Sequence, residues 1–164
     1  GIFLDQGIHM LDLFLHFAGN FDVVKASVSN LYWKTDVEDN AFIIVENTKS
    51  KISASLHSTM TQWRHLFSLE IFLERGYLVL NGLKTSSNSY GKEILTIAKN
   101  RSLPPASSWT KEINKEYNVD NSFEVETKIF IDSVVKNKPI SSSNSKDALK
   151  LMKIVDQIYK NQKK

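Results

Sequence analysis

The chain has 164 residues, of which 41% are hydrophobic and 24% are charged, and its formal net charge is +3. This composition is typical of a soluble globular domain with one compact core. The absence of cysteine excludes disulfides and thiolate metal sites, and no apolar run is long enough to span a bilayer. The lysines are spread along the chain instead of forming a basic stripe. We therefore expect a cytoplasmic protein that binds neither nucleic acid nor membrane.

The first expected element is a helix from Asp5 to Gly19, because glycine is a common helix stop signal. Apolar residues surround it, so most of its circumference is expected to be buried. Four polar residues nevertheless recur at i, i+4, i+7 and i+11, a spacing that places them on one stripe of the helix. They are Asp5, His9, Asp12 and His16.

Three explanations fit this stripe. In a structural role, Asp5 caps the helix and Asp12 pairs with a neighbouring histidine. Histidine and aspartate can also ligate a metal, but four ligands from one straight helix cannot surround an ion, so we expect no metal. The third explanation is acid–base chemistry, since a histidine oriented by a carboxylate can exchange a proton with a substrate hydroxyl.

Alternation of apolar and polar residues predicts six or seven strands, joined mostly by turns of hairpin length. They are expected within 21–33, 41–46, 51–60, 66–74, 77–80, 93–99 and 109–117. Residues 101–108 contain two adjacent prolines and are expected to form an exposed crossing.

Two helices close the chain. The first begins at Asp120 or Asn121 and ends near Asn137, and the second begins near Asn144 or Ser145. The side chains expected to face inward in the first are Phe123, Phe130, Ile131 and Val134. The whole order predicts an α+β fold with an open, mainly antiparallel sheet and helices on one face. An apolar sheet face without cover needs a partner, so we expect a homodimer.

Residues 5–12 follow the pattern Asp-x-Gly-x-His-x-x-Asp, and an apolar helix and a glycine come after them. This segment resembles the start of the C-terminal domain of the glucose–fructose oxidoreductase, inositol dehydrogenase and rhizopine catabolism (Gfo/Idh/MocA) family. Residues 67–82 are similar to that family's strand, glycine turn and strand, and residues 147–159 are similar to its last helix. The resemblance implies one substrate-binding and dimerisation domain over residues 1–164, with a fold like the C-terminal domain of glyceraldehyde-3-phosphate dehydrogenase.

Members of that family begin with a Rossmann domain, whereas this chain has neither a G-x-G-x-x-G turn nor the Glu-Lys-Pro segment that carries a catalytic lysine. The resemblance thus implies the substrate-binding half of an NAD(P)-dependent oxidoreductase, inactive without its missing nucleotide-binding domain. The implied reaction interconverts a secondary alcohol and a ketone on a sugar, cyclitol or sugar derivative. NAD or NADP would be bound mainly by the absent domain, and the open sheet face would pair subunits into a homodimer or a dimer of dimers. The alternative is a stand-alone carbohydrate-binding or dimerisation module without catalysis.

The same resemblance assigns roles to residues. His9 matches the catalytic histidine that takes the hydroxyl proton, and Asp5 matches the aspartate that orients it; Asp12 supports them or touches substrate. Trp63 and His65 precede the strand expected at 66–74 and match residues that help to bind substrate, since an aromatic face can cover a sugar ring. Between them, Arg64 can meet an anionic substrate such as a uronate or a nucleotide sugar. The simpler alternatives are a tryptophan packed on the core and a solvated surface arginine.

Overall fold

The computed structural model describes residues 1–99, 109, 111–140 and 143–161. The chain divides into two compact units, of which one comprises Gly1–Gln62 and Pro139–Lys164 and the other comprises Trp63–Lys138. The assignment of residues 1–164 to one family-type domain stays a prediction. The crossing expected at 101–108 lies outside the described residues. Among the described residues, no helix is both long and apolar enough to cross a membrane.

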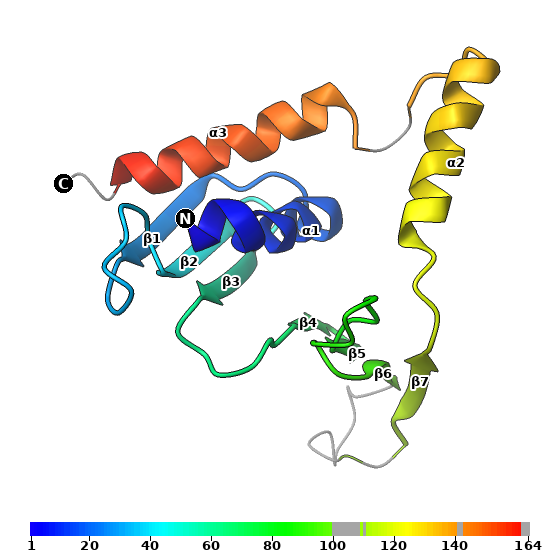
Figure 1. Ribbon diagram of the computed structural model, residues 1–164, viewed down its shortest axis with the longest axis horizontal. Helices are drawn as coiled ribbons and strands as arrows, with labels where there is room; N and C mark the ends of the chain where they lie inside the picture. The colour runs from blue at the N-terminus through cyan, green and yellow to red at the C-terminus, as the bar shows by residue number, and fades with distance from the viewer. Residues whose placement is uncertain (100–108, 110, 141–142, 162–164) are drawn as a thin grey trace. The chain divides into compact units, whose positions relative to one another are not determined.

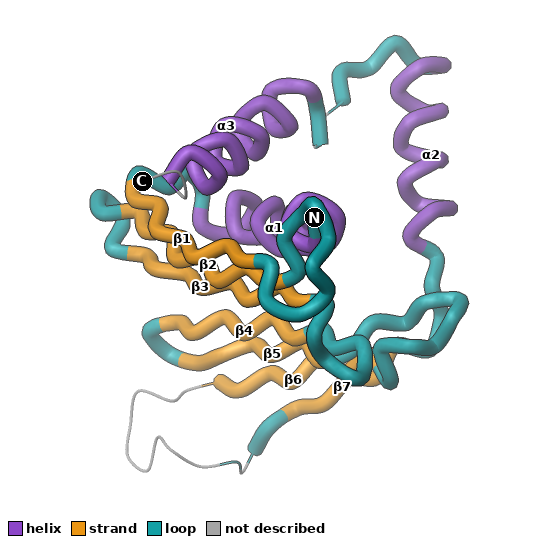
Figure 2. The backbone as a smooth tube through the Cα atoms, turned by 60° about the vertical axis from the view of Figure 1, so that its left-hand side comes forward, coloured by secondary structure: helices purple, strands orange, loops and turns teal. Residues whose placement is uncertain are grey.

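The first unit is a three-stranded antiparallel sheet with helices on one of its faces (Figure 1). Its strands are hydrogen-bonded in the order β1-β2-β3, and Figure 2 shows them side by side. Their bounds are β1 Val23–Ser29, β2 Asn40–Asn47 and β3 Ile52–Thr59. The helices are α1, Ile8–Ala18, which a short π-helix η1, Phe3–Gly7, precedes, and α3, Ser145–Asn161.

Strand alternation separates the two faces of this sheet. Ala41, Ile43 and Val45 of β2 are buried beneath the helices, whereas Phe42 and Ile44 between them are exposed on the other face. The core cluster lies on the covered face. Its buried members are Phe3, Leu11, Ala41, Ile43, Val45, Leu56, Ile154, Val155 and Ile158. The sheet therefore has one covered face and one open face, as the sequence predicts.

The first helix is less buried than its composition predicts. Leu11 is the one fully buried residue of α1, and Phe17 is exposed. The expectation that most of its circumference is buried is wrong, because the sheet and α3 cover only part of it. The remaining surface of α1 is open, including the side that carries the polar stripe.

The second unit is a four-stranded antiparallel sheet followed by a helix. The strands, in the hydrogen-bonded order, are β4 Ser68–Leu73, β5 Gly76–Asn81, β6 Glu93–Lys99 and β7 Ile113–Tyr117. β7, which forms within the strand range predicted at 109–117, lies at the edge of the sheet, and the register aligns aliphatic residues such as Leu69, Leu80 and Leu95 across one face. The helix is α2, Ser122–Val135.

The side chains expected to face inward on α2 are exposed. None of its residues is buried, and Phe123 retains 78% of its accessible surface. The period of 3.6 residues predicts that a helix forms here, but it does not identify what covers its apolar side. That part of the prediction is wrong for this structure, whereas the helix itself is confirmed.

The fold class is confirmed. The described residues form an α+β fold with seven strands, and each strand pair is antiparallel. The strands are hydrogen-bonded as two open sheets instead of one, because β3 and β4 do not pair.

Candidate active site

The segment that carries the first residues of the polar stripe packs on β3 through Gly7. Gly7 is buried there, and a Cβ atom on it would lie 2.7 Å from Cδ2 of Phe3 and 3.1 Å from Cβ of Ser58. Such distances leave no room for a side chain. The glycine of the Asp-x-Gly-x-His pattern therefore permits close packing of the helix on the strand, and that packing positions His9 two residues later.

Glu38, in the β1–β2 loop, ties this segment to the rest of the unit. Its Oε1 accepts hydrogen bonds from the backbone N–H of Phe3 at 3.2 Å and from the hydroxyl of Tyr159 on α3 at 2.8 Å. Burial opposes ionisation of Glu38, but these hydrogen bonds stabilise the carboxylate and its pKa is lowered. Burial and the nearby Glu38 carboxylate raise the pKa of Tyr159. Glu38 thus links the start of η1 to α3 through the β1–β2 loop.

The four residues of the stripe are exposed. No hydrogen bond or ion pair joins Asp5, His9, Asp12 and His16 to one another in the described structure; Asp5 instead accepts a hydrogen bond from Nε2 of Gln6 at 3.1 Å. No side chain caps η1 by a hydrogen bond. Neither the cap nor the carboxylate–imidazole pairs of the structural explanation are therefore present, and the imidazole of His9 remains accessible.

The π-helix explains why Asp5 and His9 do not meet. Asp5 lies in η1, where the backbone N–H of Ile8 bonds to the carbonyl of Phe3 five residues earlier, whereas His9 lies in α1. Because a π turn takes more residues than an α turn, residues four apart are no longer stacked across it. The orienting role of Asp5 stays a prediction, since catalytic hydrogen bonds often tighten only when substrate is bound.

The second predicted cluster lies in the other unit. Trp63, Arg64 and His65 are all exposed, and the relative exposure of Trp63 is 102%. The alternative in which Trp63 packs on the core is therefore wrong. The ring of His65 contacts the ring of Tyr90, with centroids 5.0 Å apart and planes at 52°. Tyr90 could not be selected from the sequence, because its contact with His65 depends on the long connection between β5 and β6.

The first unit also contains a buried carboxylate that is not evident from the sequence. The side chain of Asp39 is inaccessible to solvent and accepts backbone N–H groups from three successive residues, Leu31 at 2.9 Å, Tyr32 at 2.7 Å and Trp33 at 2.9 Å. The hydrogen bond from Leu31 lowers the pKa of Asp39 most, and those from Trp33 and Tyr32 lower it further. Burial opposes ionisation but does not outweigh them. Asp39 therefore fixes the β1–β2 loop from within.

This arrangement predicts an acid-sensitive loop. The pKa of Asp39 is lower in the folded than in the unfolded chain, so its contribution to stability is present above the unfolded value of 3.8 and is lost as the pH falls further. The free energy of unfolding of Asp39→Asn should therefore fall less steeply than that of wild type below about pH 4. Denaturant titrations at several pH values measure this, with Asp36→Asn as control. Parallel profiles for wild type and Asp39→Asn would contradict it.

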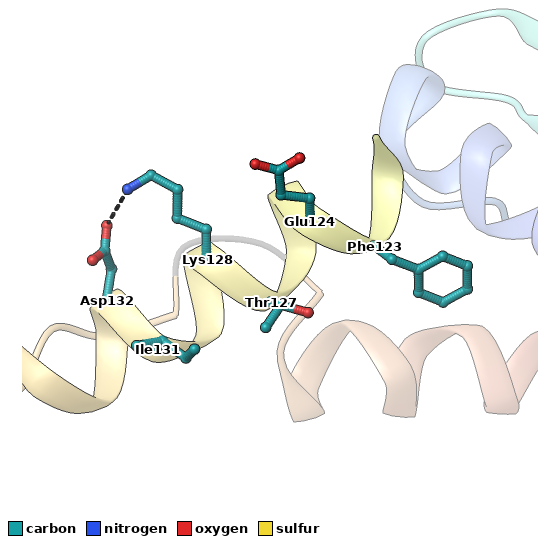
Figure 3. Close-up of a pocket in the computed structure, with 6 residues that line it drawn as sticks. All are labelled: Phe123, Glu124, Thr127, Lys128, Ile131 and Asp132. Carbon is teal, nitrogen blue, oxygen red and sulfur yellow. Dashed lines mark ion pairs between the residues drawn. The ribbon is translucent and has the colours of Figure 1, made fainter. Parts of the chain in front are cut away.

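An open hollow runs along α2, but it contains none of the predicted site residues. It is lined by Phe123, Glu124, Thr127, Lys128, Ile131 and Asp132, all from one helix (Figure 3). Lys128 and Asp132 form an ion pair of 3.6 Å across one turn of that helix. Since one helix supplies the entire lining, the hollow does not enclose a ligand and we assign it no function.

The model of the GFO/IDH/MocA C-terminal domain matches residues 1–79. This part of the chain belongs to the GFO/IDH/MocA C-terminal domain family. The resemblance in residues 5–12 is thereby confirmed, and the matched residues 1–79 contain both His9 and the Trp63–His65 cluster. No curated protein sequence matches the chain significantly.

Solved oxidoreductase structures have the same fold. A putative NADPH-dependent oxidoreductase from Desulfitobacterium hafniense is similar with a TM-score of 0.77 and 13% identity, over 99% of this chain and 46% of that one. A 3-ketoreductase from Actinomadura kijaniata, solved with TDP-benzene and NADP, is similar with a TM-score of 0.71 and 15% identity, over 98% and 47%. The WlbA dehydrogenase from Bordetella pertussis, solved with NADH and UDP-GlcNAcA, has a TM-score of 0.67 and 16% identity, over 99% and 43%. The chain thus spans about half the length of these structures.

The described residues of the chain do not fit a dinucleotide. A pyrophosphate cradle combines a parallel strand, a glycine-rich turn and a helix N-terminus. Here each strand pair in the described ranges is antiparallel, and the glycines lie singly. We therefore assign no cofactor-binding residue to this chain.

Proposed function

We propose that this chain is the substrate-binding half of an NAD(P)-dependent oxidoreductase that interconverts a secondary alcohol and a ketone on a sugar, cyclitol or sugar derivative. The observation that carries the proposal is the accessible imidazole of His9 within the family-matched segment, with the exposed carboxylates of Asp5 and Asp12 nearby in the sequence. The cofactor, held by a separate nucleotide-binding domain, supplies the redox chemistry. Because that domain is needed, the chain alone is proposed to be inactive.

His9 supplies the proton chemistry in this proposal. An imidazole at the substrate hydroxyl accepts its proton during oxidation and returns it during reduction. The packing of Gly7 on β3 and the bonds of Glu38 hold the helix that carries it. Asp5, four residues before His9, and Asp12, three residues after it, are proposed to orient the imidazole or to accept substrate hydroxyls once substrate is bound.

Trp63 and His65 are proposed to bind the substrate ring. An exposed indole offers a flat apolar face that matches the axial C–H surface of a sugar or cyclitol, and the imidazole can hydrogen-bond a hydroxyl. Arg64 lies between them and is exposed, so it is available to an anionic group. Of two structures with the same fold, one was solved with the sugar nucleotide UDP-GlcNAcA and the other, a 3-ketoreductase, with the nucleotide TDP-benzene, which supports this substrate class.

A dehydrogenase screen of the full-length enzyme tests the proposal. The probes are myo-inositol, D-glucose, D-glucuronate and UDP-N-acetylglucosamine, each with NAD and with NADP, and reduced cofactor is followed by absorbance. We expect turnover of at least one probe by the full-length enzyme and none by residues 1–164 alone. Sugar binding without any turnover would instead support a stand-alone carbohydrate-binding module.

We also propose that the open sheet face pairs two copies of the chain. Phe42 and Ile44 are exposed on β2, the central strand of the first sheet, and Ile44 retains 46% of its accessible surface. Phe42 stacks on His57 of β3, with ring centroids 4.0 Å apart and planes at 6°, and burial lowers the pKa of His57. A central strand with apolar residues on its open face is a surface that a second copy can cover.

Ile44→Glu should convert this dimer into a monomer, because a second copy would bury the new carboxylate. The folded monomer should tolerate the change, since Ile44 pairs across the sheet with Lys25. Size-exclusion chromatography with light scattering measures the mass, and Leu149→Glu on the exposed surface of α3 is the control. A wild-type chain that is monomeric at high concentration would refute the proposed interface.

A further inference from the structure

We propose that Tyr90 is a positioning residue that holds His65 in the Trp63–His65 cluster, so that the β5–β6 loop, residues 82–92, tunes the affinity for the substrate ring. The inference rests on the proposed function of that cluster, but it names a residue and a loop that lie outside the family-matched range of residues 1–79. All the residues involved belong to one compact unit, Trp63–Lys138.

The contact itself has the geometry of an aromatic pair. The ring centroids of His65 and Tyr90 are 5.0 Å apart and tilted by 52°, within the range in which aromatic rings attract each other. His65 is otherwise exposed, and in the described structure it takes part in no hydrogen bond or ion pair. Tyr90 is half-buried, whereas His65 is exposed. The tyrosine ring is thus the support that the structure gives to the imidazole.

The backbone brings these two rings together across 25 residues of sequence. The N–H of Gly82 donates to the carbonyl of Phe67 at 2.9 Å, so the loop starts beside the segment that carries His65. Gly82 has a φ of +73°, and a Cβ atom there would lie 2.1 Å from the carbonyl oxygen of Lys92 and 3.0 Å from that of Tyr90. The backbone at Tyr90 and Lys92 therefore passes close to Gly82. This places Tyr90 at the end of the sheet where the segment with His65 enters β4.

A second bond closes the loop. The N–H of Lys84 donates to Oε2 of Glu93, the first residue of β6, at 2.8 Å. With the Gly82 bond, it restrains both ends of the loop against the sheet. A ring on such a restrained loop loses little further freedom when a ligand binds, and preorganisation of this kind improves affinity.

This arrangement suits a ligand with a saturated ring that carries hydroxyl groups. Trp63 projects fully into solvent and offers its face, while His65, braced by Tyr90, offers a polar edge two residues away. The ligand surface that matches both is one apolar ring face beside a hydroxyl. If Tyr90 only stabilised the loop, its removal would lower stability without a specific effect on ligand affinity.

Two variants separate these possibilities. Tyr90→Phe keeps the ring and removes only the hydroxyl, whereas Tyr90→Leu keeps an apolar side chain and removes the ring. Phe72→Ala is the matched control, because it removes an exposed ring that contacts Tyr77 elsewhere on the same sheet, at 6.1 Å. The ring-proton resonances of His65 report the contact directly, and thermal unfolding reports any loss of stability.

The affinity is measured in two ways with the four screening probes: as KM in the full-length enzyme and as binding to residues 1–164 by the shift of the His65 resonances. We expect Tyr90→Leu to shift the His65 resonances and to raise KM or Kd by about 3–10-fold. The kcat should stay within about twofold of wild type. Tyr90→Phe and Phe72→Ala should leave these constants within about twofold of wild type, since both retain the His65 contact.

The possible outcomes distinguish this inference from the proposed function. Turnover by the wild-type enzyme with equal KM for Tyr90→Leu and Tyr90→Phe would overturn the role of Tyr90 and leave the proposed function standing. Probe binding that weakens in Tyr90→Leu, without turnover in any form, would support Tyr90 and overturn the oxidoreductase proposal. Absence of both turnover and binding in wild type would overturn both.

Discussion

Replacement of His9 by alanine in the full-length enzyme should lower kcat by about 10²–10⁴-fold, the usual contribution of a general acid–base group. The structure supports this expectation because the imidazole of His9 is exposed on the family-matched helix. Within the described chain it forms no hydrogen bond or ion pair with a neighbouring side chain. Initial rates of cofactor reduction with the best probe of the screen measure the effect. A rate within threefold of wild type would remove His9 from the mechanism.

His16→Ala is the matched control, since His16 lies on the same stripe two turns later and its ring contacts Phe17. Its kcat should remain close to that of wild type. Added imidazole should restore part of the activity of His9→Ala, because a soluble base can enter the space that the side chain leaves. Rescue of this kind indicates a lost proton acceptor, which a general disturbance of the helix would not produce.

The periodicity of the sequence was enough to predict the elements. Alternation over residues 93–99 predicts a strand with the observed bounds of β6, and Gly19 ends the first helix as expected. These features depend on neighbours along the chain. The local pattern in residues 122–135 likewise predicts α2, but its cover is a tertiary property, and the structure leaves Phe123 and Phe130 exposed.

The site was predicted where it lies on one segment and missed where it depends on distant segments. His9 and Trp63 could be selected from residues 5–12 and 62–65, and both side chains are accessible as a site requires. Asp39 could not be selected from the sequence, since its three backbone donors come from a loop whose path is not encoded by a local pattern. Tyr90 meets His65 only through the register of the β4–β5 hairpin and the return of the β5–β6 loop. The π turn at Asp5 is equally invisible to a helical period of 3.6 residues.

Gly7→Ala should lower the free energy of unfolding by about 1–2 kcal/mol. The new methyl group would lie 2.7 Å from the ring of Phe3, which is fully buried, and 3.1 Å from Cβ of Ser58 on β3, so the helix or the core must shift. Overpacking of this kind costs about 1–3 kcal/mol, and the better helix propensity of alanine offsets up to about 1 kcal/mol of it. Urea unfolding of wild type and variant measures the difference.

The control for that measurement is Gln6→Ala, which places a methyl-sized side chain on the exposed side of the same turn. It should change stability by less than about 0.5 kcal/mol, as surface substitutions usually do. If Gly7→Ala were as stable as Gln6→Ala, the close approach of η1 to β3 would be wrong. In that case the packing that positions His9 would also need another basis, because Gly7 lies against Ser58 of β3.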